Sequence, residues 1–222
     1  MKVELIAFTP YASAVCCDAA AICADSKNGY RSLVHAMESS HESVLEHAVF
    51  TFRVEGLSRA ALAQLTRHRL ASFSVQSQRY VKLENPELVI PESIKYSSFA
   101  GEAESTMRCC MNLYQRMLDA GIPAEDARYV TPQAVTTSLI VTMNARELRH
   151  FFSLRCCNRA QWEIRSLADE MLRLCMREAP TLFENAGPGC IRSACPEKRS
   201  CGSPRTKGEW NEERNADPRQ PV

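Results

Sequence analysis

The strongest helical pattern in the chain begins near residue 144 and ends near residue 177, with a break expected near residues 156–158. In its second half, apolar side chains recur at the spacing of one helix face that packs into a core. These side chains are Ala160, Ile164, Leu167, Met171 and Leu174. A chain of 222 residues can bury one sizeable core. We therefore expect a globular fold with one long C-terminal helix.

Shorter patterns predict strands and further helices. Alternating or β-branched runs predict extended segments at 3–8, 49–55, 73–79 and 138–143. The pattern at 138–143 is also compatible with a helix. Apolar spacing and capping residues predict helices at 11–23, 31–38, 58–69, 107–118 and 123–128. Gly56 is expected to end the second strand, and Ser58 to cap the helix that follows. The expected fold class is α+β, with mixed helices packed on a small, mostly antiparallel sheet.

The composition changes after Gly187. Residues 190–222 contain few apolar side chains and many Gly, Pro, Arg, Lys and Glu residues. We therefore expect a folded domain at 1–189 and a polar tail at 190–222, which we expect to be disordered beyond Cys201.

Charge and cysteine content limit the class of protein. The formal net charge is +1, so a general affinity for nucleic acid or for an anionic membrane is not expected. The 11 cysteines, with adjacent pairs such as Cys16-Cys17, do not resemble a secreted disulfide framework. No apolar run reaches the roughly 18 residues that a membrane span needs, and the N-terminus lacks a signal-peptide pattern. We expect a soluble, cytoplasmic protein.

Cations and polar side chains are concentrated between residues 66 and 80. This segment contains Arg67, His68, Arg69 and Arg79. Guanidinium and imidazole groups are costly to bury unless an anion meets them. The segment therefore predicts a local site for a ligand rich in phosphate or carboxylate.

The same segment resembles the signature of the flavin-dependent thymidylate synthases, in which Arg-His-Arg is followed by seven residues and then a serine. Here the signature consists of Arg67-His68-Arg69 and Ser77. Further blocks resemble other parts of that family in the same order along the chain, and several blocks match by chance far less often than one. These blocks are SHESVLEH at 40–47, ARYVTP at 127–132, NAREL at 144–148, LR at 154–155 and AQWEI at 160–164.

The resemblance implies two sets of ligand-binding residues. The residues that it assigns to FAD are His41, Ser43, Arg67, His68, Arg69, Asn144, Arg146 and His150. The residues that it assigns to the nucleotide substrate, dUMP, are Gln64, Arg67, Gln76, Ser77, Gln78, Arg79, Arg128 and Arg155. Two ligands that carry phosphate groups account for the number of arginines, because guanidinium groups bind phosphate oxygens bidentately.

Arg155 is the catalytic residue that the resemblance implies. On the predicted helix it shares a face with Leu148, Phe151 and Phe152, so we expect its aliphatic stem to be buried. A guanidinium beside the uracil ring stabilises negative charge that develops on the N3/O2 edge. C5 of the ring then becomes more nucleophilic without a covalent bond to the enzyme.

The implied reaction is the reductive methylation of dUMP to dTMP. In the family, 5,10-methylenetetrahydrofolate supplies the carbon, NADPH reduces the FAD, and the reduced flavin rather than the folate delivers the hydride. The resemblance also implies a homotetramer with active sites shared between subunits and no bound metal, and it makes residues 1–189 the catalytic domain. Two positions depart from the family pattern, because Val75 stands where Glu or Gln is frequent and His150 where Asn is frequent.

Three other interpretations stay open from the residues alone. Cys156, beside Arg155, could act as a thiolate nucleophile, as in the cysteine-dependent thymidylate synthases. Cys190, Cys195 and Cys201 could hold a metal ion, although they lack a Cys-x-x-Cys pair. The arginine segment could also belong to a non-catalytic nucleotide- or nucleic-acid-binding module. The balanced charge and the absence of interleaved aromatic residues argue against that module.

Overall fold

The structure is a computed structural model that describes residues 1–83 and 86–205. The chain divides into two compact units. Unit 1 comprises Met1–Lys2, Val54–Arg67 and Phe73–Ile140, and unit 2 comprises Val3–Arg53, His68–Ser72 and the chain from Val141 onward. The predicted α+β class is confirmed, since helices accompany a small, four-stranded antiparallel sheet.

The sheet has the strand order β1-β2-β4-β3. Its strands are β1 (Lys2–Phe8), β2 (Val49–Ser58), β3 (Ala71–Val75) and β4 (Thr136–Asn144). Burial alternates along β2 and β4, as it does where one face of a strand packs on a core. The buried residues include Phe50 and Phe52 in β2 and Leu139 and Met143 in β4. The strands predicted around β1, β2 and β4 are thus confirmed.

Helices make up the rest of the regular structure. In chain order they are α1 (Ala12–Cys23), α2 (Gly29–Glu38), α3 (Arg59–Leu65), α4 (Glu92–Lys95), α5 (Ala100–Asp119), α6 (Ala124–Ala127), α7 (Ala145–Arg155), α8 (Trp162–Glu178) and α9 (Pro180–Phe183). Short 3-10 helices are η1 (Glu42–His47), η2 (Arg128–Val130) and η3 (Gly189–Ile191). The predicted break near residues 156–158 is confirmed by the gap between α7 and α8, and α8 is the long C-terminal helix.

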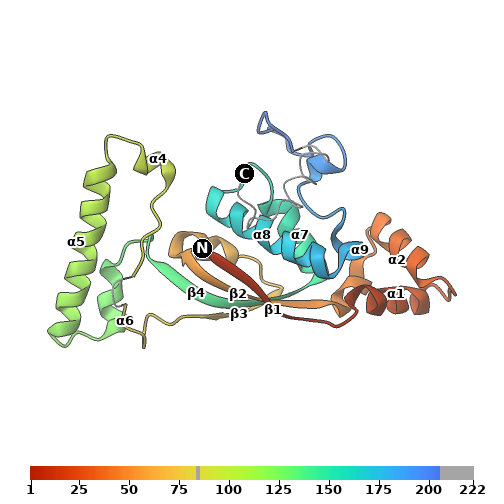
Figure 1. The fold of residues 1–222 in the computed structure, drawn as a ribbon, viewed down its shortest axis with the longest axis horizontal. Helices are drawn as coiled ribbons and strands as arrows, with labels where there is room; N and C mark the ends of the chain where they lie inside the picture. Colours follow the sequence, from red (N-terminus) through yellow and green to blue (C-terminus); the bar gives the residue numbers. More distant parts are fainter. Residues whose placement is uncertain (84–85, 206–222) are drawn as a thin grey trace. The chain divides into compact units, whose positions relative to one another are not determined.

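The core of unit 2 forms around α7 and α8, which lie side by side (Figure 1). Their buried faces carry residues such as Leu148 and Phe152 in α7 and Leu167 in α8. The ring of Phe152 lies 6.0 Å from that of Phe183, which in turn lies 5.3 Å from Phe50. Burying side chains of this size contributes roughly 1.5–3 kcal/mol each. This packing fixes α7, the helix that carries Arg155.

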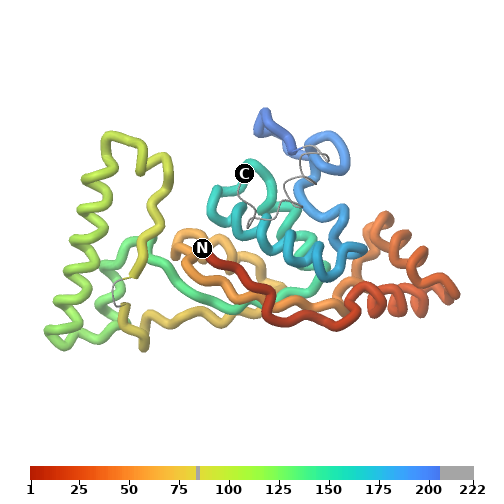
Figure 2. Tube along the Cα trace, in the orientation of Figure 1, coloured from red at the N-terminus to blue at the C-terminus, as the bar shows by residue number. Residues whose placement is uncertain are grey.

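Helices α1 and α2 form a second packed pair in unit 2 (Figure 2). The pair approaches closely at Gly29, where a Cβ atom would lie 2.6 Å from the carbonyl oxygen of Cys17. Only glycine permits that contact. Asn28 caps α2, because its side-chain oxygen accepts a hydrogen bond from the backbone N–H of Arg31 over 3.0 Å.

Unit 1 contains α5 and a smaller core formed by Leu83, Tyr114, Ala127 and Val135. The phenolic oxygen of Tyr114 accepts a hydrogen bond from the backbone N–H of Leu83 over 3.2 Å. Helix α5 ends just before Gly121, which adopts a φ of 86°. A glycine in this left-handed conformation is a frequent helix end, and the end predicted near residue 118 is confirmed.

Two predicted boundaries near the arginine segment are wrong. Strand β2 continues past Gly56 to Ser58, because Gly56 adopts a φ of 78° inside the strand instead of ending it. Helix α3 ends at Leu65 rather than near residue 69. The Thr66 hydroxyl donates to the carbonyl oxygen of Leu62 over 3.1 Å, and the chain then leaves the helix toward β3. Ser58 caps α3 as predicted, since its hydroxyl accepts a hydrogen bond from the N–H of Ala61 over 3.1 Å.

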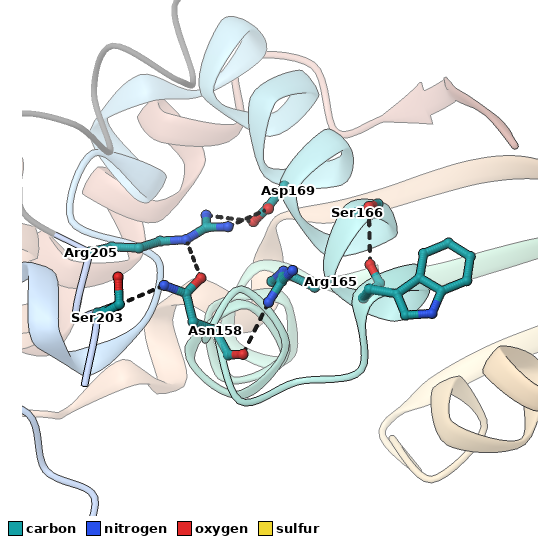
Figure 3. A network of polar contacts seen from close by, with 7 residues as sticks. Asn158, Arg165, Ser166, Asp169, Ser203 and Arg205 are labelled. Carbon is teal, nitrogen blue, oxygen red and sulfur yellow. Dashed lines mark hydrogen bonds and ion pairs between the residues drawn. The ribbon is translucent and has the colours of Figure 1, made fainter. Parts of the chain in front are cut away.

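The last described residues contact the loop between α7 and α8 (Figure 3). Arg205 donates to the side-chain oxygen of Asn158 over 3.1 Å and contacts both carboxylate oxygens of Asp169, at 2.9 and 3.1 Å. Asn158 donates to the carbonyl oxygen of Ser203 over 2.8 Å and accepts from Arg165 at its own carbonyl over 3.0 Å. The division of the chain at residue 189 stays a prediction. The predicted disorder beyond Cys201 falls mainly on residues 206–222, which lie outside the described residues.

Candidate active site

A buried histidine in unit 2 links two charged residues of α7. His68 is 5% exposed, and its Nδ1 lies 3.1 Å from Oε1 of Glu147, which is 7% exposed. At the other side of the ring, Nε of Arg155 donates to Nε2 of His68 over 3.1 Å. A carboxylate only accepts and a guanidinium only donates. These partners therefore place the ring proton on Nδ1 and leave the imidazole neutral.

The surroundings of His68 favour the neutral ring. Burial lowers the pKa of His68 below its ordinary value, and the nearby Arg155 and His150 act in the same direction, whereas the hydrogen bond and the charge of Glu147 oppose the shift. The ring of Phe151 packs edge-on against the imidazole at 4.9 Å. Arg155, half-buried at the end of α7, is thus contacted by a neutral acceptor that is itself held on three sides.

The sequence of α7 explains why these groups meet. Glu147, Phe151 and Arg155 are spaced by four residues, so they lie on one face of the helix. The side-chain oxygen of Asn144 accepts a hydrogen bond from the N–H of Glu147 over 2.9 Å and so caps the helix. Glu147 in the first turn and Arg155 in the last turn both suit the helix dipole.

The other residues predicted to hold FAD lie in both units and mostly on the protein surface. Arg67 and Arg69 are exposed, Arg67 in unit 1 and Arg69 in unit 2. On α7, Arg146 is half-exposed and its Nη1 lies 2.5 Å from Oε1 of Glu46. His150 is exposed on the same helix.

His41 and Ser43 line a cavity of about 530 Å³ in unit 2. Arg31 and His35, four residues apart on α2, line the same cavity. Sequence reasoning missed these two residues, although their spacing puts them on one helix face. With Ser26 and Ser32, the cavity combines one guanidinium, two imidazoles and three hydroxyls, which can together bind an anionic or hydrogen-bonding ligand.

A second cavity, of about 470 Å³, lies in unit 1. Its polar lining includes Arg59, Thr66, Gln78 and Arg128, and none of the described residues that line it is acidic. Burial lowers the pKa of Arg59 below its ordinary value, and the charge of Arg128 adds to the effect. Two guanidiniums that line one cavity can together bind an anion, which would offset their mutual repulsion.

Arg59 is a residue that sequence reasoning missed. It is the first residue of α3, where the positive end of the helix dipole disfavours a cation. The signal was present in the sequence, because Ser58 was predicted to cap this helix and Arg59 follows it directly.

The remaining residues predicted to hold the nucleotide belong to unit 1. Gln64 is half-buried on α3, and Gln76 is exposed just after β3. The Ser77 hydroxyl accepts a hydrogen bond from the N–H of Arg79 over 3.1 Å. The Arg79 side chain is about half-exposed and its Nε donates to Oε2 of Glu125 over 2.8 Å.

Comparison with known proteins identifies the family. The family model described as thymidylate synthase complementing protein matches residues 4–181, from β1 into α9. The chain belongs to this family. The family predicted from the motifs is therefore confirmed, and so is the prediction of an enzyme of this type.

Several relatives are named flavin-dependent thymidylate synthase. The relative from Geobacter sulfurreducens is 49% identical over 219 residues, which covers 91% of this chain and 94% of the relative. The one from Clostridium tetani is 40% identical over 234 aligned residues, covering 91% and 93% of the two chains. The one from Pyrococcus furiosus is 50% identical over 168 residues, covering 71% and 69%.

In this member of the thymidylate synthase complementing protein family, burial sets the state of several cysteines. Cys156, directly after Arg155, is fully buried. Burial and the adjacent Cys17 raise the pKa of Cys16 to about 11. Complete burial also raises the pKa of Cys175. The raised pKa values make the thiols of Cys16 and Cys175 poor nucleophiles.

Residues 1–83 and 86–205 contain neither a metal-binding cluster nor a membrane-spanning helix. There, no group of three His, Cys, Asp or Glu side chains is arranged to hold a metal ion. No helix in the same ranges combines the length and apolar composition that crossing a membrane requires.

Proposed function

We propose that this protein is a flavin-dependent thymidylate synthase that converts dUMP to dTMP. The observation that carries the proposal is the 49% identity, over 91% of the chain, to a relative named for this activity. The cofactor is FAD, the carbon donor is 5,10-methylenetetrahydrofolate and the reductant is NADPH. Hydride transfer is the chemistry that the flavin supplies when bound, so the protein has mainly to bind, orient and polarise.

The cavity in unit 1 suits the phosphate of dUMP. The phosphate carries close to two negative charges at neutral pH, and the cavity offers the guanidiniums of Arg59 and Arg128 with the amide of Gln78. An anion there relieves the repulsion between the two arginines. We therefore add Arg59 to the nucleotide-binding set: Gln64, Arg67, Gln76, Ser77, Gln78, Arg79, Arg128 and Arg155.

The donor set in unit 2 fits a flavin dinucleotide. FAD carries a pyrophosphate group and a ring with several hydrogen-bonding atoms, which call for cations and hydrogen-bond donors. The cavity of about 530 Å³ lined by His41, Ser43, Arg31 and His35 offers such groups. The proposed FAD-binding set is His41, Ser43, Arg67, His68, Arg69, Asn144, Arg146 and His150.

Arg155 is the proposed catalytic residue. Its guanidinium stays charged at any physiological pH, and its Nε is held by His68. Placed against the N3/O2 edge of uracil, it stabilises the negative charge that develops there and raises the nucleophilicity of C5. This role needs no enzyme nucleophile, and the burial of the Cys156 thiol supports that mechanism over a covalent one.

We extend the proposal to a cytoplasmic homotetramer. Residues 1–189 form its catalytic domain and residues 190–222 a separate tail. The end of the family match at residue 181, shortly before the composition changes, supports this division.

Flavin binding and two substitutions test the proposal. The purified protein should show the absorbance of bound flavin, directly or after reconstitution with FAD. Arg155→Ala should keep the flavin and lose at least about 100-fold in dTMP formation, the order of loss seen when one electrostatic group is removed. Cys156→Ala should keep its turnover. A protein that cannot be reconstituted with flavin, or an Arg155→Ala variant with full turnover, would contradict the proposal.

A further inference from the structure

The contact between His68 and Arg155 connects a buried carboxylate to the proposed catalytic arginine. We propose that His68 and Glu147 are a positioning pair, which fixes the orientation of the Arg155 guanidinium through its Nε. This inference rests on the proposed function, because it gives a purpose to Arg155 only if that residue acts on the substrate. It concerns residues of unit 2 alone.

The two hydrogen bonds of the His68 ring both depend on its neutral form. Glu147 accepts the proton of Nδ1, so the lone pair of Nε2 points at Arg155 and accepts its Nε–H, with both contacts at 3.1 Å. A protonated ring would present an N–H at Nε2 and would face the guanidinium donor to donor. The contact with Arg155 therefore exists only while His68 is neutral.

Burial and packing hold the side chains of His68 and Glu147 in place. His68 and Glu147 are 5% and 7% exposed, so neither is free to rotate into solvent. The edge-on ring of Phe151 at 4.9 Å closes the space beside the imidazole. His68 thereby bridges the first and the last turn of α7 from a segment that lies between α3 and β3. A side chain locked in this way can fix its neighbour to the tolerance that catalysis needs.

The partner of Arg155 at Nε is a neutral imidazole and not a carboxylate. A carboxylate in direct contact with Arg155 would offset its positive charge. Glu42 has this effect on Arg149, whose Nε donates to Oε1 of Glu42 over 3.2 Å. With a neutral imidazole in between, Glu147 orients Arg155 without forming an ion pair through that Nε. The contact at Nε therefore adds no negative charge next to the guanidinium.

Two substitutions of His68 separate this role from a structural one. Asn places its amide near the position of Nδ1, so His68→Asn keeps a donor for Glu147 but loses the acceptor for Arg155. Gln places its amide near the position of Nε2, so His68→Gln keeps an acceptor for Arg155 but loses the donor for Glu147. A structural role makes His68→Gln the worse variant, because it leaves a buried carboxylate without its donor. A positioning role makes His68→Asn the worse one.

The measurement is steady-state dTMP formation with the FAD-loaded protein, alongside flavin content and melting temperature. We expect His68→Asn to lower kcat, measured at saturating FAD, about 10- to 100-fold, the scale of a displaced catalytic group. The change in dUMP affinity should be smaller, and any loss of flavin should be partial, because His68 also belongs to the proposed FAD-binding set. His68→Gln should retain most of kcat despite a lower melting temperature. In an Arg155→Ala background, His68→Asn should cost no further turnover. His47→Asn, at an exposed position of η1, is the matched control.

Other outcomes overturn the inference. These are equal kcat values for the two His68 variants, a full-sized effect of His68→Asn in the Arg155→Ala background, or loss of flavin as the only defect. A readout without turnover tests the pair even if the protein makes no dTMP. In flavin-free protein with ¹⁵N-labelled histidine, His68 should give the signals of a neutral Nδ1–H ring, and Arg155→Ala should shift the Nε2 signal. A protonated ring at pH 7.5, or an unmoved Nε2 signal, would rule the pair out independently of the proposed function.

Discussion

Arg59 lies in the first turn of α3, where the positive end of the helix dipole disfavours a cation, and it faces the cavity together with Arg128. Arg59 lowers the stability of the folded protein in two ways, through its position at the positive end of the helix dipole and through repulsion by the charge of Arg128. The cost is understandable if a dianion occupies the cavity, since the bound phosphate would meet both guanidiniums and the N-terminal end of the helix.

Arg59→Ala should therefore weaken dUMP binding and stabilise the apoprotein. Hydrogen bonds to charged groups contribute about 1.5–3 kcal/mol, so the dissociation constant for dUMP should rise by about 10- to 100-fold. Arg108→Ala, which removes an exposed arginine paired with Glu104 on α5, is the control and should leave binding unchanged. Calorimetric titration with dUMP measures the affinity of each variant and of the wild type. Equal affinities for wild type and Arg59→Ala would show that Arg59 is not part of the site.

His68 makes stability depend on pH in a defined direction. Its pKa is lowered in the folded protein below the value of about 6.5 that it has in the unfolded chain. Between these two values the unfolded state binds more protons, so this contribution to stability is complete above about pH 6.5 and is lost as the pH falls toward the folded pKa.

The free energy of unfolding of the wild type should thus fall more steeply between pH 7 and pH 5 than that of His68→Gln. Urea denaturation at a series of pH values measures both slopes. Equal slopes would show that the ring is not kept neutral by its position between Glu147, Arg155 and His150.

At the scale of elements, α7 and α8 are joined by a loop that the segment 197–205 covers. Arg205 reaches both Asn158 in the loop and Asp169 on α8 (Figure 3). Arg159 in the same loop donates to the carbonyl oxygen of Arg199 over 2.6 Å. Since Arg155 ends α7, this segment restrains the loop that follows the proposed catalytic residue.

Arg205→Ala should release the segment from α8. We expect limited trypsin digestion to cleave within residues 192–199 several-fold faster than in the wild type, because proteolysis follows the population of the open form. Arg177→Ala, which removes an exposed arginine beside Glu178, should leave that rate unchanged. An unchanged rate in Arg205→Ala would show that the contacts with Asn158 and Asp169 do not hold the segment.

Over the whole molecule, local patterns predicted the elements well and the site less completely. The apolar spacing of α8, the cap at Ser58 and the end of α5 at Gly121 depend on residues close in sequence, and all were predictable. The position of His68 was not, because its burial depends on Glu147 and Phe151, far along the chain. Glu147 lies in the first turn of α7, where an acidic residue is favoured whatever its function.

The difference between local patterns and contacts distant in sequence also explains the wrong predictions near the arginine segment. A helix that continued to residue 69, as predicted, would place Gln64, Arg67 and His68 on one face, but α3 ends at Leu65. The chain turns there and carries His68 into a buried position in unit 2, which no spacing rule describes. The resemblance assigned His68 to FAD, and its contacts with Glu147 and Arg155 lead us to propose a positioning role for it as well.

The central claim is that this chain methylates dUMP with a hydride that comes from the flavin and not from the folate. The most direct measurement combines the FAD-loaded protein with dUMP, NADPH and 5,10-methylenetetrahydrofolate and quantifies the products. We predict dTMP and tetrahydrofolate in equal amounts, because a folate that gives up only its carbon keeps its reduced ring. Formation of dihydrofolate with dTMP, or no dTMP from a fully flavin-loaded protein, would contradict the account.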